Sequence, residues 1–385
     1  MAFDFDEFVN RRNTASVKWD MAPFDVLPLW VADMDFKAPN EVLEVLKERI
    51  LHGIFGYTYP QDSYYQAVID WMKRRHNWQI EKDWIIITPG IVTALFIIVQ
   101  AFTKEKDAVL IQQPVYNPFM DAVIKNNRKL VNSPLVNVDG YYQIDFVDFE
   151  QKIIDNDVKL FIMCSPHNPV GRVWTKEELI KIGEICLKHN VLIVTDEIHH
   201  DLVFKGNKHI PFASISSEFS NQCITCTAPS KTFNLAGLKI SNIIIENKTI
   251  RDKYLDFIKK ISLGSSNIFG LLACEASYNK GEKWLEQVMT YIEDNKKLVI
   301  GFFAKNFPQI KITNSEATYL LWIDCRALNI DHKNLENLLY NDAKLWLNQG
   351  YVYGEEGEGF VRLNLACTRE VLKEALERIK KVFYS

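Results

Sequence analysis

One lysine lies among small, neutral residues in a setting that could give it unusual chemistry. Lys231 follows the apolar run Cys223–Thr227, which predicts a buried strand, and sits between Ser230 and Thr232. A lysine beside a buried strand is partly removed from water, and desolvation lowers the pKa of its amine until it can attack an aldehyde. We therefore interpret Lys231 as a candidate Schiff-base lysine, with pyridoxal phosphate as the aldehyde. An ordinary solvated loop lysine is the alternative.

A carboxylate follows another predicted strand, as the ring nitrogen of this cofactor requires. Asp196 comes after the apolar run Val191–Thr195, at the carboxyl end of a strand, where open α/β sheets bind ligands. A carboxylate there keeps the pyridinium nitrogen protonated, so that the ring accepts electrons. A helix cap or a surface acid is the alternative, but a cap would not require the histidines that follow, His199 and His200.

Two further strand ends carry an amide and an aromatic ring. Asn168 lies in the turn Ser165–Gly171, after the run Leu160–Cys164, and its amide could donate to the cofactor or to a substrate carboxylate without adding charge. A purely structural turn explains the same residues. Tyr116, in another such turn, has a ring suited to stacking on a pyridine face.

A glycine turn and an arginine could bind anionic groups. Gly90 separates the run Trp84–Thr88 from a predicted helix, and free amides with the helix dipole favour a phosphate there, although such turns are common. Ser230 and Thr227 could add hydroxyl donors. Arg362 lies in the apolar run 360–364 and can hold a carboxylate with two parallel bonds. A buried structural ion pair is the alternative for Arg362.

These residues can form one site only if a sheet brings the ends of several strands close together. Short apolar runs alternate with helical periodicity from residue 84 to 246, which predicts a mostly parallel sheet covered by helices. The runs are Trp84–Thr88, Ala108–Ile111, Leu160–Cys164, Val191–Thr195, Cys223–Thr227 and Ile240–Ile245. One of the helices, Thr175–Asn190, has a capping box in Thr175 and Glu178.

The ends of the chain have a different composition. Two amphipathic helices, Asn40–Gly53 and Ser63–Arg75, precede the sheet, and the runs Tyr319–Ile323 and Gly359–Leu363 follow a long helix. We expect an N-terminal segment at residues 1–43 that joins a small domain. A large domain at 44–285 binds the cofactor, and the small α+β domain occupies 286–385.

Composition narrows the function classes. The 385 residues include 45 Lys and Arg against 49 Asp and Glu, a net charge of −4 without long like-charge runs, so neither nucleic acid nor a membrane is an expected partner. The acidic start has no signal-peptide pattern, and seven cysteines fit a reduced compartment. We expect a cytoplasmic protein. Cys223 and Cys226 form a C-x-x-C without partner ligands, so we interpret them as strand core and expect no metal site.

Taken together, the motifs resemble fold type I pyridoxal phosphate enzymes of the class I/II aminotransferase superfamily, over nearly the whole chain. The motifs are Ser165–Gly171, Thr195–His199, Ser230–Asn234 and the strand of Arg362, in this order. More narrowly, Leu29–Phe36, His52–Tyr57, Ser230–Asn234, Tyr353–Gly357 and Phe360–Asn364 are similar to the MalY/PatB branch of cystathionine β-lyases or cysteine-S-conjugate β-lyases. The resemblance implies an α/β fold of the PLP-dependent transferase type, with a mostly parallel seven-stranded sheet.

The resemblance also implies a role for each site residue. Lys231 would be the Schiff-base lysine and catalytic base. The cofactor would be held by Gly90, Ile91, Val92, Tyr116, Asn168, Asp196, Ile198, His199 and Ser230, and by Tyr57 reaching the neighbouring subunit of a homodimer. Arg362, Asn168 and Asp33 would bind the substrate. Many aminotransferases of the superfamily have an arginine eight positions after the lysine, where this chain has Lys239, so the phosphate contacts of Lys239 and Thr227 stay open.

The activity implied is a carbon–sulfur β-lyase acting on cystathionine or another S-substituted cysteine, in methionine biosynthesis. It would release a thiol, pyruvate and ammonia. An aminotransferase is the alternative, because the same residues serve both reactions. A pyridoxal-dependent transcriptional regulator would carry an added DNA-binding domain, and only some thirty residues precede Trp30. The natural substrate and any regulatory protein partner stay open.

Overall fold

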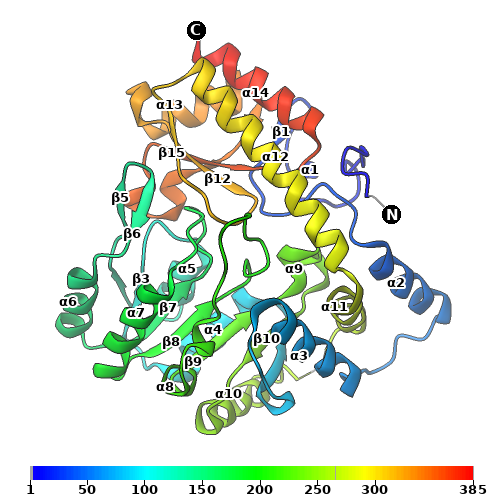
Figure 1. Cartoon of the computed structure of the whole chain (residues 1–385), viewed down its shortest axis with the longest axis vertical. Coiled ribbons are helices and arrows are strands. Elements are labelled where there is room, and N and C mark those ends of the chain that lie inside the picture. Colours follow the sequence, from blue (N-terminus) through cyan, green and yellow to red (C-terminus); the bar gives the residue numbers. More distant parts are fainter. Residues whose placement is uncertain (1–2, 265, 385) are drawn as a thin grey trace.

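The largest sheet forms the centre of the protein (Figure 1). The structure is a computed structural model that describes residues 3–264 and 266–384. The sheet has seven strands in the order β2-β10-β9-β8-β7-β3-β4. Their bounds are β2 Ile85–Thr88, β3 Ala108–Ile111, β4 Lys129–Asn132, β7 Val158–Cys164, β8 Leu192–Asp196, β9 Cys223–Thr227 and β10 Ser241–Ile244. Only β10 runs antiparallel to its neighbours, so the prediction of a mostly parallel seven-stranded sheet is confirmed.

Helices cover both faces of this sheet, because its central strands are apolar on both sides. In β7, Leu160 and Ile162 belong to one core cluster and Phe161 and Met163 to the other, as the two-residue repeat of a strand requires. The first face packs against α4 Ile91–Phe102, α5 Pro118–Ile124 and α10 Lys248–Lys260. The second packs against α3 Asp62–His76, α6 Phe146–Asn156, α7 Lys176–Lys188 and α11 Ile268–Lys280.

Most of the predicted elements are confirmed within a few residues at their ends. The predicted helix over 175–190 is α7, and both hydrogen bonds of the Thr175–Glu178 capping box are present. The first predicted amphipathic helix is α2, Asn40–His52. Cys223 and Cys226 are buried, free cysteines in β9, as expected of strand core.

A second, smaller sheet lies between the first sheet and the last helices (Figure 1). Its order is β11-β12-β15-β14, with β11 Lys311–Ile312, β12 Leu320–Asp324, β14 Asn348–Gln349 and β15 Phe360–Asn364. The helices of this part are α12 Glu282–Asn306, α13 His332–Asn337 and α14 Arg369–Phe383. Other short elements are α1 Val17–Asp20, β5 Val136–Val138, β6 Tyr141–Gln143, α8 Ser217–Asn221 and α9 Pro229–Thr232.

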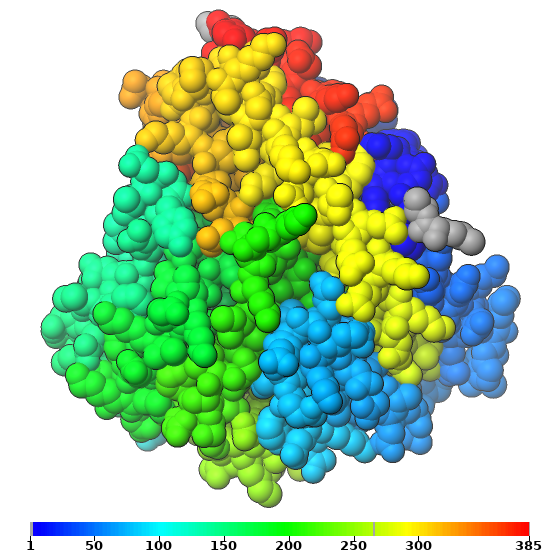
Figure 2. Space-filling view, viewed as in Figure 1, coloured from blue at the N-terminus to red at the C-terminus, as the bar shows by residue number. Residues whose placement is uncertain are grey.

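The two ends of the chain lie together. The short strand β1, Leu27–Pro28, pairs in parallel with β13, Leu345–Trp346. Figure 2 shows the dark-blue N-terminal residues packed beside the yellow and red C-terminal helices. This contact supports an N-terminal segment that joins the C-terminal part, while the boundaries at 43 and 285 stay a prediction. No helix among the described residues is long and apolar enough to cross a bilayer.

The edge strand β4 and the hairpin of β5 and β6 are among the strands that no predicted run covered. The edge strand β4 has only Val131 buried among its four residues, because an edge strand needs no continuous apolar sequence. The hairpin of β5 and β6 is mostly exposed, with Tyr142 its buried residue. Both were missed because an apolar run was the signal for a strand.

Candidate active site

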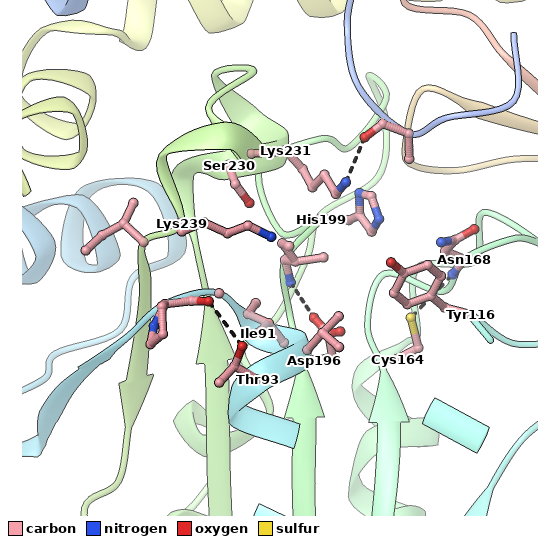
Figure 3. A pocket seen from close by; sticks show the side chains of 17 residues that line it. Ile91, Thr93, Tyr116, Cys164, Asn168, Asp196, His199, Ser230, Lys231 and Lys239 are labelled. Carbon is pink, nitrogen blue, oxygen red and sulfur yellow. Dashed lines mark hydrogen bonds between the residues drawn. The ribbon is translucent and has the colours of Figure 1, made fainter. Parts of the chain in front are cut away.

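A cavity opens at the carboxyl ends of β7 and β8, beside the first turn of α4 (Figure 3). It is lined by Ala32, Pro89, Gly90, Ile91, Val92, Thr93, Tyr116, Cys164, Asn168, Asp196, Ile198, His199, Ser230, Lys231, Ala236, Lys239 and Ile240. Ten of the residues predicted to catalyse or to bind the cofactor are in this set. They come from five separate stretches of sequence, which the parallel sheet brings to one edge.

Lys231 reaches into this cavity from α9 (Figure 3). Its Nζ donates a hydrogen bond of 2.7 Å to the main-chain oxygen of Ala32. Burial, with the charges of Arg362 and Lys239, lowers the pKa of the amine to about 8, against the opposing charges of Asp33 and Asp196. A much larger share of this amine is therefore neutral and nucleophilic near pH 7 than for a solvated lysine.

Asp196, the last residue of β8, is 5% exposed. Burial raises the pKa of its carboxyl group to about 7, against a hydrogen bond of 3.1 Å from the amide of Ile198 and the charge of Lys231. A cation bound next to this group lowers its pKa again and keeps it ionised. The site therefore favours a positively charged ligand group at this point.

His199 is a neutral imidazole beside Lys231 (Figure 3). Burial and the charges of Lys231 and Arg362 hold its pKa well below the usual range. Its Nδ1 is buried and has no hydrogen-bond partner among the described residues. A buried orphan nitrogen is uncommon in proteins, and a polar ligand in the cavity would satisfy it.

Arg362 lies next to Asn168 but is not part of the cavity lining. Its guanidinium is 2% exposed and donates to Asn168 Oδ1 at 3.1 Å and to the Trp30 carbonyl at 2.7 Å. It also lies 5.2 Å from the centre of the Tyr353 ring, and its Nε has no partner among the described residues. None of these partners is a carboxylate, so the described residues form no structural ion pair with Arg362. A buried cation without a counter-ion is costly, which suits an anionic ligand.

The start of α4 offers an anion site. Gly90 has φ +94°, a conformation that favours glycine, and precedes the first turn. Its own amide donates to Thr88 O at 2.9 Å, so the amides of Ile91 and Val92 are the better donors. Ser230 and Lys239 also line the cavity, whereas Thr227 does not, because its hydroxyl donates to Asn242 O of β10 at 3.2 Å.

Besides Arg362, two predicted site residues lie outside the cavity lining. Asp33 forms ion pairs with Arg11 at 2.6 Å and Lys18 at 3.7 Å, and its charge acts on Lys231 from outside the lining. Tyr57 is fully exposed, in the segment after α2. Its predicted partner belongs to a second subunit, so a single chain does not test it.

Sequence reasoning assigned no role to several side chains that fix the segment 30–36. Asn234 and Asn364 donate to its main-chain oxygens, and Tyr319 donates to the Ala32 carbonyl at 3.0 Å. Asn234 and Asn364 are in motifs that were singled out. Nothing in their spacing, however, indicates a bond to main chain 200 or more residues away.

A buried group of His76, His200 and Asp201 lies under the lysine turn, close enough together to hold a metal ion. Its geometry favours hydrogen bonding instead. Asp201 already accepts from His76 at 2.9 Å and from Thr232, next to Lys231, at 2.9 Å. The nearby charge of Asp201 raises the pKa of His200 despite burial, and His200 holds that of Asp201 well below its usual range. Both carboxylate oxygens of Asp201 are thus already engaged by His76, Thr232 and His200.

The fold and this cavity define a class of protein: an α/β enzyme whose buried lysine of lowered pKa faces a buried carboxyl group at the edge of a mostly parallel sheet. The chain belongs to the aminotransferase class I and II family, whose model matches residues 25–379, and within it to the MalY/PatB-type branch.

Several relatives cover the chain almost completely. Cystathionine beta-lyase PatB of Bacillus subtilis is 46% identical over 98% of this chain and 99% of its own, and protein MalY of Escherichia coli is 32% identical over 97% of each. Among solved structures, cystalysin from Treponema denticola with pyridoxal 5'-phosphate has a TM-score of 0.97 and 43% identity, covering 100% and 99%. The PLP-bound C-S lyase from Staphylococcus hominis has a TM-score of 0.95 and 35% identity, covering 100% and 99%.

Proposed function

We propose that this protein is a pyridoxal phosphate-dependent carbon–sulfur β-lyase. It cleaves cystathionine or a related S-substituted cysteine and, with one water, releases a thiol, pyruvate and ammonia. The observation that carries the proposal is the meeting, in one cavity, of Lys231 with a pKa of about 8 and Asp196 with a raised pKa. The lyases among its relatives support the same activity.

The residues of the cavity fit the cofactor. The carboxyl group of Asp196 suits the protonated ring nitrogen, and the orphan Nδ1 of His199 suits a polar ring substituent. The first amides of α4, with Ser230 and Lys239, suit the phosphate. Tyr116, beside Asn168 in Figure 3, would stack on the ring, with Ile198 on the cavity wall. When bound, this cofactor supplies an aldehyde for the lysine and a ring that accepts electrons.

The chain's own groups would then position and deprotonate the substrate. Arg362 and Asn168 would hold its α-carboxylate, since no described residue bonds the Nε of Arg362 or offers it a counter-ion. The neutral amine of Lys231 would take the proton from the α-carbon, and its pKa of about 8 suits a base near neutral pH. The thiolate on the β-carbon then leaves with the bonding electron pair.

An aminotransferase uses the same residues, so the assay must separate the two reactions. We expect the purified holoenzyme to release thiol and pyruvate in equal amounts from cystathionine. We expect at most slow glutamate formation from an amino acid with 2-oxoglutarate. Thiol is measured with a chromogenic disulfide and pyruvate with lactate dehydrogenase. Steady glutamate formation without pyruvate would contradict the lyase, and a panel of S-substituted cysteines would identify the preferred substrate.

A homodimer is part of the proposal. The last turn of α2 and the segment after it expose Ile50, Leu51, Ile54, Phe55, Tyr57 and Tyr59. A row of exposed apolar side chains is typical of a protein interface. Tyr57 from this segment would reach the phosphate in the neighbouring subunit. Asp33 stays a proposed substrate-binding residue, and its charge also acts on Lys231. We further propose domain boundaries at 43 and 285, a cytoplasmic location and a role in methionine biosynthesis.

The dimer leads to a prediction for Tyr57→Phe. This change removes only the hydroxyl that would bond the phosphate in the neighbouring subunit. We therefore expect the cofactor affinity to fall about tenfold, with the dimer intact. Cofactor binding is titrated by absorbance, and mass is measured by light scattering. Tyr59→Phe, in the same exposed segment, is the matched control. A fully active monomer, or unchanged affinity in Tyr57→Phe, would contradict the shared site.

A further inference from the structure

Five consecutive main-chain oxygens, from residue 30 to residue 34, each accept a hydrogen bond from a side chain distant in sequence. Trp30 O accepts from Arg362, Val31 O and Asp33 O from Asn364, Ala32 O from Lys231 and Tyr319, and Met34 O from Asn234. Because its neighbours on both sides are held by other donors, the Ala32 oxygen keeps its place without Lys231. It is a preformed acceptor.

Two donors share this oxygen. The Nζ of Lys231 lies 2.7 Å from it and the hydroxyl of Tyr319 lies 3.0 Å from it. A carbonyl oxygen has two lone pairs, so each donor takes one. Tyr319 is fully buried, and burial raises the pKa of its hydroxyl far above the usual range. The hydroxyl therefore stays protonated and donates throughout the pH range in which lysine titrates.

We propose that the Ala32 carbonyl is the resting site of the free Lys231 amine, and that Tyr319 is a positioning residue that weakens the hold of this site on the amine. The proposal deepens the proposed function and rests on it, because Lys231 is there the amine that must come and go in each turnover.

The physical reason is the charge of the ammonium form. A hydrogen bond from an ammonium group is stronger than one from a neutral amine, so an acceptor offered to Lys231 alone favours the charged form and raises its pKa. Tyr319 donates to the same oxygen, and a second donor weakens the hydrogen bond that this oxygen can accept from Lys231. Its effect adds to burial and to the charges of Arg362 and Lys239, which lower the pKa of Lys231, and opposes those of Asp33 and Asp196.

The consequence for turnover follows. After the amine is released from the cofactor it must reach the α-carbon of the substrate, and a tightly held ammonium group would do so slowly. With Tyr319 on the same oxygen, the amine still has a defined position, but its hydrogen bond to Ala32 is weaker. The amine therefore stays largely neutral and can leave the oxygen readily. Tyr319 acts on the reaction only through Lys231.

The test is the pKa of Lys231 in Tyr319→Phe, which removes one hydroxyl and keeps the ring. The full chain, freed of cofactor and confirmed as folded by circular dichroism, is labelled with trace acetic anhydride between pH 6 and 10. Acetylation at Lys231 is followed by peptide mass spectrometry. We expect the pKa to rise by about half a unit to one unit, and labelling at pH 7 to fall about three- to tenfold.

Tyr254→Phe is the matched control, a buried tyrosine in α10 outside the cavity, and its Lys231 should titrate as in the wild type. An unchanged or lower pKa in Tyr319→Phe would overturn the proposal. Should that variant fail to fold, Tyr319→Met, which also lacks the hydroxyl, is measured in the same way. Because labelling needs neither cofactor nor substrate, its result stands apart from failure of the lyase assay.

Discussion

Lys231→Ala is expected to lower kcat/KM for thiol release by about 10⁴-fold, since both the nucleophile and the base are lost. Lys231→Arg should be equally inactive, because a guanidinium stays protonated and cannot act as an amine at neutral pH. The structure gives the reason for choosing this lysine: it lines the cavity, and its amine has a pKa of about 8. Initial rates of pyruvate release measure the effect.

Two further measurements separate catalysis from folding. Borohydride should fix the cofactor covalently to the wild type, on the peptide that contains Lys231, and not to Lys231→Ala. Lys248→Ala, an exposed lysine in α10 that pairs with Asp252, is the control and should retain full activity. A Lys231→Ala protein that folds, binds the cofactor and still releases thiol at a tenth of the wild-type rate would refute the assignment.

Arg362→Met is expected to lower kcat/KM by about 10³-fold, mostly through a higher KM, because the substrate carboxylate would lose its buried counter-ion. Arg362→Lys should lose about 10²-fold, since an ammonium group cannot make the two parallel bonds. Steady-state kinetics on cystathionine measure both. The expectation rests on a buried guanidinium whose described partners are the oxygens of Asn168 and Trp30 and the Tyr353 ring.

Arg172 is the contrasting control, because it is fully buried between the carboxylates of Glu178 and Glu316. Removing its charge in Arg172→Met leaves two carboxylates unpaired and should cost about 3–5 kcal/mol of unfolding free energy. The KM of the folded protein should change little. Urea unfolding measures the free energy of unfolding of both variants and so distinguishes the structural role of Arg172 from the substrate-binding role of Arg362. Equal losses of stability in the two variants, with KM unchanged in Arg362→Met, would show that Arg362 is structural.

Much of the candidate site was predictable because parallel strands of one sheet end at the same edge. Asp196 and Asn168 each follow a run of apolar residues, so their meeting needed only the sheet. Lys231 follows β9 in the same way. By contrast, Thr227 was a candidate for binding the phosphate, but its hydroxyl donates to the main-chain oxygen of Asn242 instead. A side chain at the end of a strand points to one face or the other, and this depends on register.

The sequence by itself determined the class of fold, the strand ends that carry chemistry and the family, because apolar periodicity and motif residues are local properties of the chain. Only the tertiary structure decided what surrounds each group. It gave Arg362 no counter-ion among the described residues and paired Asp33 with Arg11. It also brought the Ala32 carbonyl within hydrogen-bond distance of both Lys231 and Tyr319. These contacts join residues up to several hundred positions apart, and the pKa values depend on burial. Both are set by packing, which no local pattern encodes.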